Sequence, residues 1–363
     1  MDILAAAETI AGDQGRVTAL LDGMVSAGTL PQSLLLTGPE GAGKELAAIR
    51  LAARLECDGE DCTGSARCSA CAKIAHLEHP DLHPVYPVPS GEWEKSLPVV
   101  IESRREDFFG YGEFGSRARS IGIDLVRHVI EAVSKQPFEG RRTVVFFFEA
   151  HLMTTEAQNA LLKLLEEPPP STVLVLVTEL ADRLIPTILS RCMEIRFDPL
   201  SPGAVASFLE KFCSQEAAEA RKLSLLAEGN LRRGIRLTED RFRMVRSDAA
   251  TVLRLVIDGK VKELLAEAGQ IPRQYTRDEI EEILKESMAL LRTLMRRSNG
   301  RVTETEEKLL EEAIGAARME AASGMDIPGG IRKIHRAARS LKRYADAELT
   351  LSQLLLDLVG KWY

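Results

Sequence analysis

The sequence predicts an α/β domain built on a parallel sheet, followed by two helical regions. In the first 200 residues, near-continuous apolar runs alternate with helical periodicity, which is typical of parallel strands covered on both faces. The clearest runs are 33–38, 143–150 and 172–179. Strand signals stop after Pro199, where helical patterns take over. We therefore expect three domains, an α/β core over 1–198, a three-helix region over 199–242 and an all-helical domain over 243–363.

Composition and charge restrict the class of protein. The chain has 363 residues, of which 45% are hydrophobic and 28% charged, as in an ordinary globular protein of two or three domains. It has no apolar run long enough to span a membrane, and MDILAAAETI lacks the basic start of a secretory signal, so we expect a cytoplasmic protein. The formal charge of −7 argues against a chain that grips nucleic acid alone, because neutralising phosphates requires a basic face.

A glycine-rich loop, GPEGAGKE, joins the first strand to a helix. Gly38, Gly41 and Gly43 permit the tight turn that aims backbone N–H groups at a phosphate. Lys44 would reach the β- and γ-phosphates, but Glu45 replaces the Ser or Thr whose hydroxyl binds Mg²⁺. The loop thus predicts descent from a P-loop and leaves the binding of ATP or ADP open. A glycine-rich turn without a ligand is the alternative.

The strand at 143–150 ends where a P-loop ATPase needs its second metal-binding group. There an Asp holds Mg²⁺ and a following Glu polarises the attacking water. The stretch VVFFFEAHLM resembles the Asp-Glu-Ala-His box of the AAA+ ATPases, with Phe148 in the Asp position and Glu149 in the Glu position. Because phenylalanine cannot ligate a metal, we predict little or no hydrolysis at this site. The alternative is that Glu149 is itself the metal ligand, shifted by one residue along the strand.

Four of the six cysteines lie within fifteen residues of one another. Their spacing is Cys57-x4-Cys62-x5-Cys68-x2-Cys71. Four thiolates suit Zn²⁺ in a closed, structural site, here in a module over about 56–82. His76, His79 or His83 could replace Cys62 as the fourth ligand. Reduced buried cysteines and a disulfide pair are the alternatives to zinc.

Sequence blocks after the acidic box resemble the gamma and delta-prime subunits of the bacterial clamp loader, which are AAA+ proteins. These blocks are Asn159–Lys163, Leu165–Pro169 and Ser190–Cys192. The resemblance covers nearly the whole chain except 87–120, which we expect to be an extended surface insertion. It implies a P-loop AAA+ core with a zinc module, a helical lid and a collar that packs against neighbouring collars. Alternatively, the C-terminal helices close only the core of this chain.

The resemblance also implies roles for individual residues. Arg191, between Ser190 and Cys192, matches the arginine finger that the family places in the ATP site of an adjacent subunit. A fixed guanidinium there stabilises the charge on the transferring phosphoryl group. Arg232 in GNLRR resembles the sensor arginine of the lid, and Thr178 lies near the position of the first sensor.

The altered residues favour the delta-prime role over the gamma role. Gamma-type subunits are motors that need the hydroxyl and the Asp missing here, whereas the finger is kept. We expect a DNA polymerase III subunit that joins gamma/tau-type motors and a delta-type clamp opener. It would help to load the sliding clamp on primer-template DNA through the complex. The alternatives are an ATP-hydrolysing gamma-type motor and a zinc-dependent DNA-binding regulator.

Overall fold

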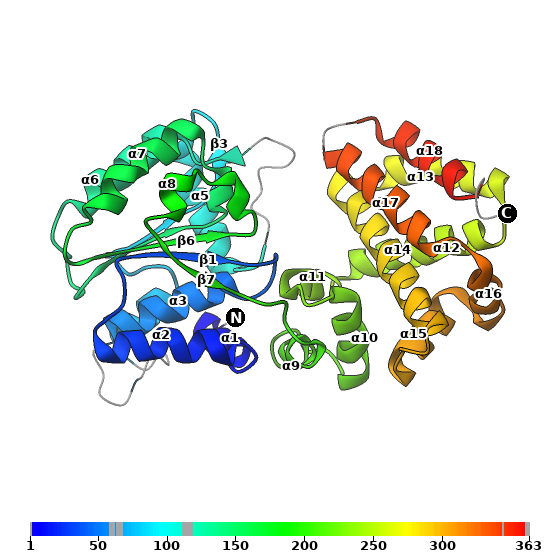
Figure 1. The fold of residues 1–363 in the computed structure, drawn as a ribbon, viewed down its shortest axis with the longest axis horizontal. Helices are drawn as coiled ribbons and strands as arrows, with labels where there is room; N and C mark the ends of the chain where they lie inside the picture. The colour runs from blue at the N-terminus through cyan, green and yellow to red at the C-terminus, as the bar shows by residue number, and fades with distance from the viewer. Residues whose placement is uncertain (1, 58–61, 63–67, 111–118, 343–344, 360–363) are drawn as a thin grey trace. The chain divides into compact units, whose positions relative to one another are not determined.

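The computed structural model describes residues 2–57, 62, 68–110, 119–342 and 345–359 (Figure 1). The chain separates into two compact units. The first is Met1–Phe212 with Gly229–Arg232, and the second is Cys213–Glu228 with Arg233–Tyr363. The domain boundaries after residues 198 and 242 remain predictions from the sequence. In the described part of the chain, no helix combines the length and the apolar character needed to cross a membrane.

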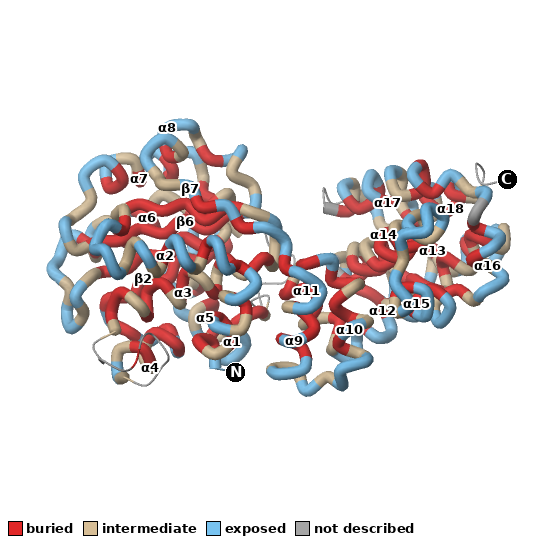
Figure 2. Tube along the Cα trace, turned by 60° about the horizontal axis from the view of Figure 1, so that its bottom comes forward, coloured by how far each residue is buried: buried red, intermediate tan, exposed pale blue. Residues whose placement is uncertain are grey.

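A five-stranded parallel sheet lies at the centre of the first unit, with the strand order β2-β5-β6-β1-β7. Its strands are β1 (Ser33–Thr37), β2 (Leu82–Val85), β5 (Thr143–Phe147), β6 (Thr172–Thr178) and β7 (Met193–Arg196). The three inner strands are buried along their whole length (Figure 2), as their apolar runs predict. The predicted α/β fold, a parallel sheet followed by helices, is confirmed.

Helices cover both faces of this sheet, with α1 to α3 along one face and α6 and α7 along the other (Figure 1). The helices of the first unit are α1 (Ile3–Ala11), α2 (Gly15–Ala27), α3 (Lys44–Glu56), α4 (Ser69–Ala75), α5 (Trp93–Glu106), α6 (Ile123–Val133), α7 (Thr155–Glu166), α8 (Pro186–Leu189) and α9 (Pro202–Phe212). Short 3₁₀ turns η1 (Ala150–Leu152) and η2 (Ala181–Arg183) follow β5 and β6. Helices therefore cover both faces of the sheet, and the ends of its strands remain available for a functional site.

The expectation that 87–120 is an extended surface insertion is wrong for the described part of this segment. Strands β3 (Val88–Pro89) and β4 (Arg119–Ser120) pair antiparallel, and the 14-residue helix α5 lies between them. Val100 and Arg104 of this helix are buried. Pro98 lies inside α5. Because a proline usually ends a helix, the sequence around Pro98 does not indicate one. Residues 111–118 lie outside the described residues. The helix α5 is thus an integral part of the first unit.

The described part of the second unit is helical. Its helices are α10 (Ala217–Ala227), α12 (Asp240–Ile257), α13 (Val261–Gln274), α14 (Arg277–Ser298), α15 (Glu304–Ile314), α16 (Ala316–Ala321), α17 (Ile327–Lys342) and α18 (Ala347–Val359), with a 3₁₀ turn η3 (Ala322–Gly324). Helix α11 (Leu231–Arg236) begins in the first unit and ends in the second. Inside the second unit, buried Arg233 donates to Glu282 at 2.8 Å and to Glu286 at 2.6 Å. These carboxylates neutralise a guanidinium that is largely removed from water.

Candidate functional site

The predicted phosphate loop connects β1 to α3. Gly38, Gly41 and Gly43 have φ angles of 133°, 68° and 87°, which lie in the region that favours glycine. A Cβ atom on Gly41 would collide with the side chain of Asn230, so this position also needs glycine for space. The loop therefore has the backbone turn that the spacing of its glycines predicts.

Lys44 is buried at the start of α3 and is bonded to its own loop. Its Nζ donates to the carbonyl oxygens of Gly38 at 2.8 Å and Pro39 at 2.5 Å. Burial lowers the pKa of Lys44 to about 8, although the carboxylates of Glu179 and Glu45 act in the opposite direction. The ammonium thus holds the loop together and would have to leave these carbonyls to reach a phosphate.

A pocket opens beside this loop at the carboxyl ends of β1, β5 and β6. Such ends are where ligands usually bind in open parallel sheets. Most of the residues predicted to bind a cofactor line it, namely Gly41, Gly43, Lys44, Glu45, Glu149, Thr178 and Arg232. Gly38 begins the loop. The structure therefore brings these residues together although they are far apart in the sequence.

The carboxylate of Glu45 faces two guanidinium groups. Arg232 Nη2 lies 3.1 Å from both carboxylate oxygens, and Arg104 Nη1 of α5 lies 3.8 Å from Oε2. The two arginine side chains are 9% and 3% exposed, so water screens these pairs weakly. A magnesium ion needs oxygen ligands at about 2.0–2.1 Å in a near-ideal octahedron. Because the carboxylate of Glu45 is paired with two cations of this chain, this residue does not fit the role of a magnesium ligand.

The second metal-binding position is filled by an aromatic stack. Phe148 follows β5, is fully buried, and stacks on Tyr86 with ring centroids 4.7 Å apart and planes 20° apart. The next residue, Glu149, has a left-handed backbone with φ 49° and lies 3.8 Å from Arg119 Nη1. Glu149 lines the pocket, so the alternative in which it holds a metal stays a prediction. Phe148, in contrast, offers no ligand atom.

His151 is a pocket residue to which the sequence analysis assigned no role. Its Nδ1 lies 3.1 Å from Thr178 Oγ1, which also accepts the backbone N–H of Leu180 at 3.0 Å. Burial, with further contributions from Arg183 and Lys44, lowers the pKa of His151 to about 4, so the imidazole is neutral at pH 7. The histidine that closes the acidic-box motif was the signal that could have identified it.

Replacing Phe148 with Asp should destabilise the first unit instead of restoring a metal site. The new carboxylate would replace a fully buried ring that packs against Tyr86 and Phe146, where burial penalises its charge. We expect a loss of about 3–5 kcal/mol in the free energy of unfolding, measured by urea titration. Phe148→Leu is the control and should cost less than about 1.5 kcal/mol. A Phe148→Asp protein that is as stable as the wild type and binds Mg²⁺ with ATP would contradict this expectation.

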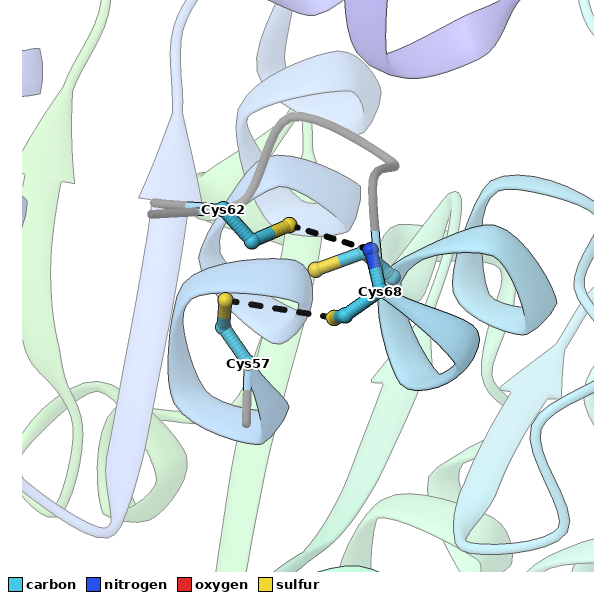
Figure 3. Close-up of side chains that lie close together, drawn as sticks. Cys57, Cys62 and Cys68 are labelled. Atoms are coloured by element: carbon cyan, nitrogen blue, oxygen red, sulfur yellow. Dashed lines mark hydrogen bonds between the residues drawn. The ribbon is translucent and has the colours of Figure 1, made fainter. Parts of the chain in front are cut away.

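The four clustered cysteines converge between α3 and α4. Cys57 caps the end of α3, Cys68 caps the start of α4, Cys71 lies within α4, and Cys62 lies between the two helices. Their sulfur atoms all lie within 4.8 Å of one another, with Cys57 Sγ and Cys68 Sγ 4.0 Å apart (Figure 3). None of these four cysteines is part of a disulfide.

This sulfur group has the size and chemistry of a metal site. Zinc–thiolate bonds of about 2.3 Å in a tetrahedron place the sulfur atoms about 3.8 Å apart. Burial and the neighbouring thiols raise the pKa of Cys71, so a thiolate there needs a cation to stabilise it. The group can thus hold a metal such as zinc. The histidines considered as substitutes lie elsewhere, with His76 bonded to the Ala72 carbonyl and buried His79 beside Glu139.

Ser190, Arg191 and Cys192 lie just after α8. Arg191 Nη2 pairs with Glu166 Oε1 at 2.6 Å, its Nη1 donates to the Thr187 carbonyl at 3.0 Å, and its side chain is 34% exposed. Ser190 Oγ also donates to the Thr187 carbonyl. Burial raises the pKa of Cys192 to about 12, so this thiol stays protonated at neutral pH. None of the three is among the described residues that line the phosphate-loop pocket.

Comparisons with known proteins match this chain to subunits of DNA polymerase III, with delta-prime and gamma/tau subunits both among the curated relatives. A family model described as DNA polymerase III, delta subunit, matches residues 13–201. The DNA polymerase III delta-prime subunit of Bacillus subtilis is 32% identical over 192 residues, which are 53% of this chain and 50% of the relative. That of Pseudomonas aeruginosa is 35% identical over 198 residues, 54% of this chain and 52% of the relative. The chain thus spans about half the length of these curated relatives.

Among solved structures, a DNA polymerase III gamma subunit-related protein from Thermotoga maritima aligns over 94% of this chain and 99% of its own. It is 17% identical, and the TM-score is 0.46.

Proposed function

Because this chain belongs to the DNA polymerase III delta-prime subunit family, we propose that it is a clamp loader subunit that completes the ATP site of a neighbour without hydrolysing ATP itself. Its partners would be gamma/tau-type motor subunits and a delta-type clamp opener. The sliding clamp and primer-template DNA would be reached through the assembled complex.

The proposal that this chain does not hydrolyse ATP is supported by one observation, namely which side chains occupy the two metal-binding positions. Glu45 is paired with Arg232, and Phe148 is buried against Tyr86. Phosphoryl transfer depends on positioning and on neutralising the charge of the phosphates, for which these ATPases use Mg²⁺. A site with both positions altered does not supply that ion, so this chain is a poor motor.

The active part of the proposal concerns Arg191. A finger acts in the site of another subunit, so it has to lie outside the pocket of its own chain and be reachable by solvent. Arg191 meets both requirements, since it is absent from the lining of the phosphate-loop pocket and its side chain is 34% exposed. Its pair with Glu166 is a surface pair worth under about 1 kcal/mol, which a phosphate could displace.

We further propose that the four cysteines hold a structural zinc ion. Four sulfur ligands complete a tetrahedron and leave no open position for a substrate or water, so the ion would supply stability and no chemistry. The buried positions of Cys62 and Cys71 support a closed site.

Replacing Lys44 with Ala tests whether this chain is a motor. The purified chain should not turn over ATP, and a reconstituted loader that carries Lys44→Ala should keep its clamp-stimulated turnover, because Lys44 serves only its own loop. Phosphate release, measured with and without clamp and primed DNA, reports both quantities. The same substitution in the motor subunits is the control and should abolish turnover.

Two results would favour the rival functions. Turnover by the isolated chain that Lys44→Ala removes would identify a gamma-type motor. Tight, strongly salt-dependent DNA binding by the isolated chain would identify a zinc-dependent DNA-binding regulator, which its formal charge of −7 disfavours.

A further inference from the structure

The two altered metal-binding positions are joined by a continuous chain of contacts. Phe148 stacks on Tyr86 at 4.7 Å, and the guanidinium of Arg104 lies over the Tyr86 ring, 5.1 Å from its centroid. The same guanidinium lies 3.8 Å from the carboxylate of Glu45, which Arg232 engages from another side. These contacts therefore link the loop to the end of β5 through the side chains of Glu45, Arg104, Tyr86 and Phe148.

Arg104 is held in this place by the segment that follows its own helix. It is 2% exposed, and its Nη1 donates to the backbone carbonyl of Phe108 at 2.5 Å. Among the described residues, its buried Nε has no hydrogen-bond partner, and neither does the hydroxyl of Tyr86. A buried guanidinium with an unmade hydrogen bond is costly, so an attraction elsewhere must offset it. The ring of Tyr86 and the carboxylate of Glu45 supply that attraction.

We propose that Arg104 is a built-in cation that replaces the divalent metal ion of the phosphate loop, and that α5 exists in this fold to deliver it. Glu45 and Phe148 stand at the two altered metal-binding positions, and on this proposal each has a role in holding Arg104. The carboxylate needs a cation, and the aromatic side chain supports the Tyr86 ring on which that cation lies. The site keeps its shape without nucleotide and without Mg²⁺, because the carboxylate of Glu45 is held by the guanidinium groups of both Arg104 and Arg232.

This inference rests on the proposal that the site does not hydrolyse ATP, but it makes a separate claim about the isolated chain. A motor of the gamma type would need its metal, whereas the finger role of Arg191 does not depend on what fills this pocket. The test therefore uses neither ATP turnover nor a partner subunit, so that its failure leaves the finger experiment untouched.

The first measurement is a double-mutant cycle on the thermal unfolding of the full chain, with Arg104→Met and Glu45→Gln. Either substitution should lower the unfolding midpoint, by roughly 5–10 °C for Arg104→Met, because a buried partner is lost. The double variant should lose clearly less than the sum of the two single losses. Additive losses would overturn the proposal.

Arg105→Met provides a matched control on the same helix. Arg105 bonds Glu102 at 2.9 Å and the Leu77 carbonyl at 3.0 Å, and neither partner belongs to the loop. Its loss and that of Glu45→Gln should add. If Arg104→Met does not fold, Arg104→Lys keeps the charge near Glu45 and permits the same cycle.

The second measurement is the response of the wild-type chain to Mg²⁺ alone. If Arg104 fills the cation position, millimolar Mg²⁺ should leave the unfolding midpoint where EDTA leaves it, and isothermal titration with MgCl₂ should give no saturable heat. A midpoint that rises with Mg²⁺ and saturates, in a manner that Glu45→Gln or Glu149→Gln abolishes, would show that a metal enters and would overturn the proposal.

Discussion

Replacing Arg191 with Ala in a reconstituted loader is expected to slow ATP hydrolysis at the neighbouring site by about a thousandfold. The guanidinium would stabilise the charge that spreads over the transferring phosphoryl group, and no other group of this chain is assigned to that task. Clamp- and DNA-stimulated phosphate release measures the effect. Arg191→Lys should recover little, because a point charge does not reproduce the planar fork of donors.

Two variants separate this role from a general effect on the surface. Glu166→Ala removes the ion pair at 2.6 Å but keeps the finger, so turnover should be preserved. Arg196→Ala removes another exposed arginine, on β7, and should also leave turnover unchanged. Unfolding of the isolated Arg191→Ala chain should differ from wild type by under about 1 kcal/mol, since the lost pair is on the surface. Unchanged turnover in the Arg191→Ala loader would remove the finger assignment.

The sheet and the loop could be predicted because their signals are local. The three buried strands appear in the sequence as apolar runs. The glycines of the loop have φ angles of 68° to 133°, a backbone conformation that favours glycine. The loss of a metal ligand at Phe148 could also be predicted, since a phenyl ring offers no ligand atom in any surroundings. In these cases the residues of a short stretch of sequence determine the structural feature by themselves.

Arg104 could not be predicted, because its meaning depends on a contact that is distant in the sequence. An arginine in a charged helix is usually solvated, and only the fold brings it to 3.8 Å from Glu45 and over Tyr86. Pro98 also hid the helix that carries it. The role of Arg191 is different again, since its surface position alone indicates nothing and only the resemblance of its motif suggests a finger. A role that depends on tertiary contacts or on a partner subunit therefore cannot be predicted from a short stretch of sequence.

Loss of the four-cysteine group should have the largest effect on the stability of the first unit. The expected result for the purified wild type is about one zinc ion per chain by elemental analysis, which Cys71→Ser abolishes. Structural zinc sites contribute apparent free energies on the order of 10 kcal/mol in small zinc-finger peptides, so loss of the metal should cost several kcal/mol here. The reason is that the module between α3 and α4 has four buried or half-buried thiols and no disulfide to take over the role of the ion.

Cys213→Ser is the matched control, because this half-buried cysteine belongs to the second unit and lies outside the sulfur group. It should keep both the zinc and the unfolding curve. Treatment of the wild type with a strong chelator should reproduce the Cys71→Ser result. Helix α3 runs from Lys44 to the residue before Cys57, so a metal at one end fixes the helix that carries the phosphate-loop lysine at the other. Full zinc content in Cys71→Ser, or an unfolding curve that the chelator leaves unchanged, would show that these thiols are only buried cysteines.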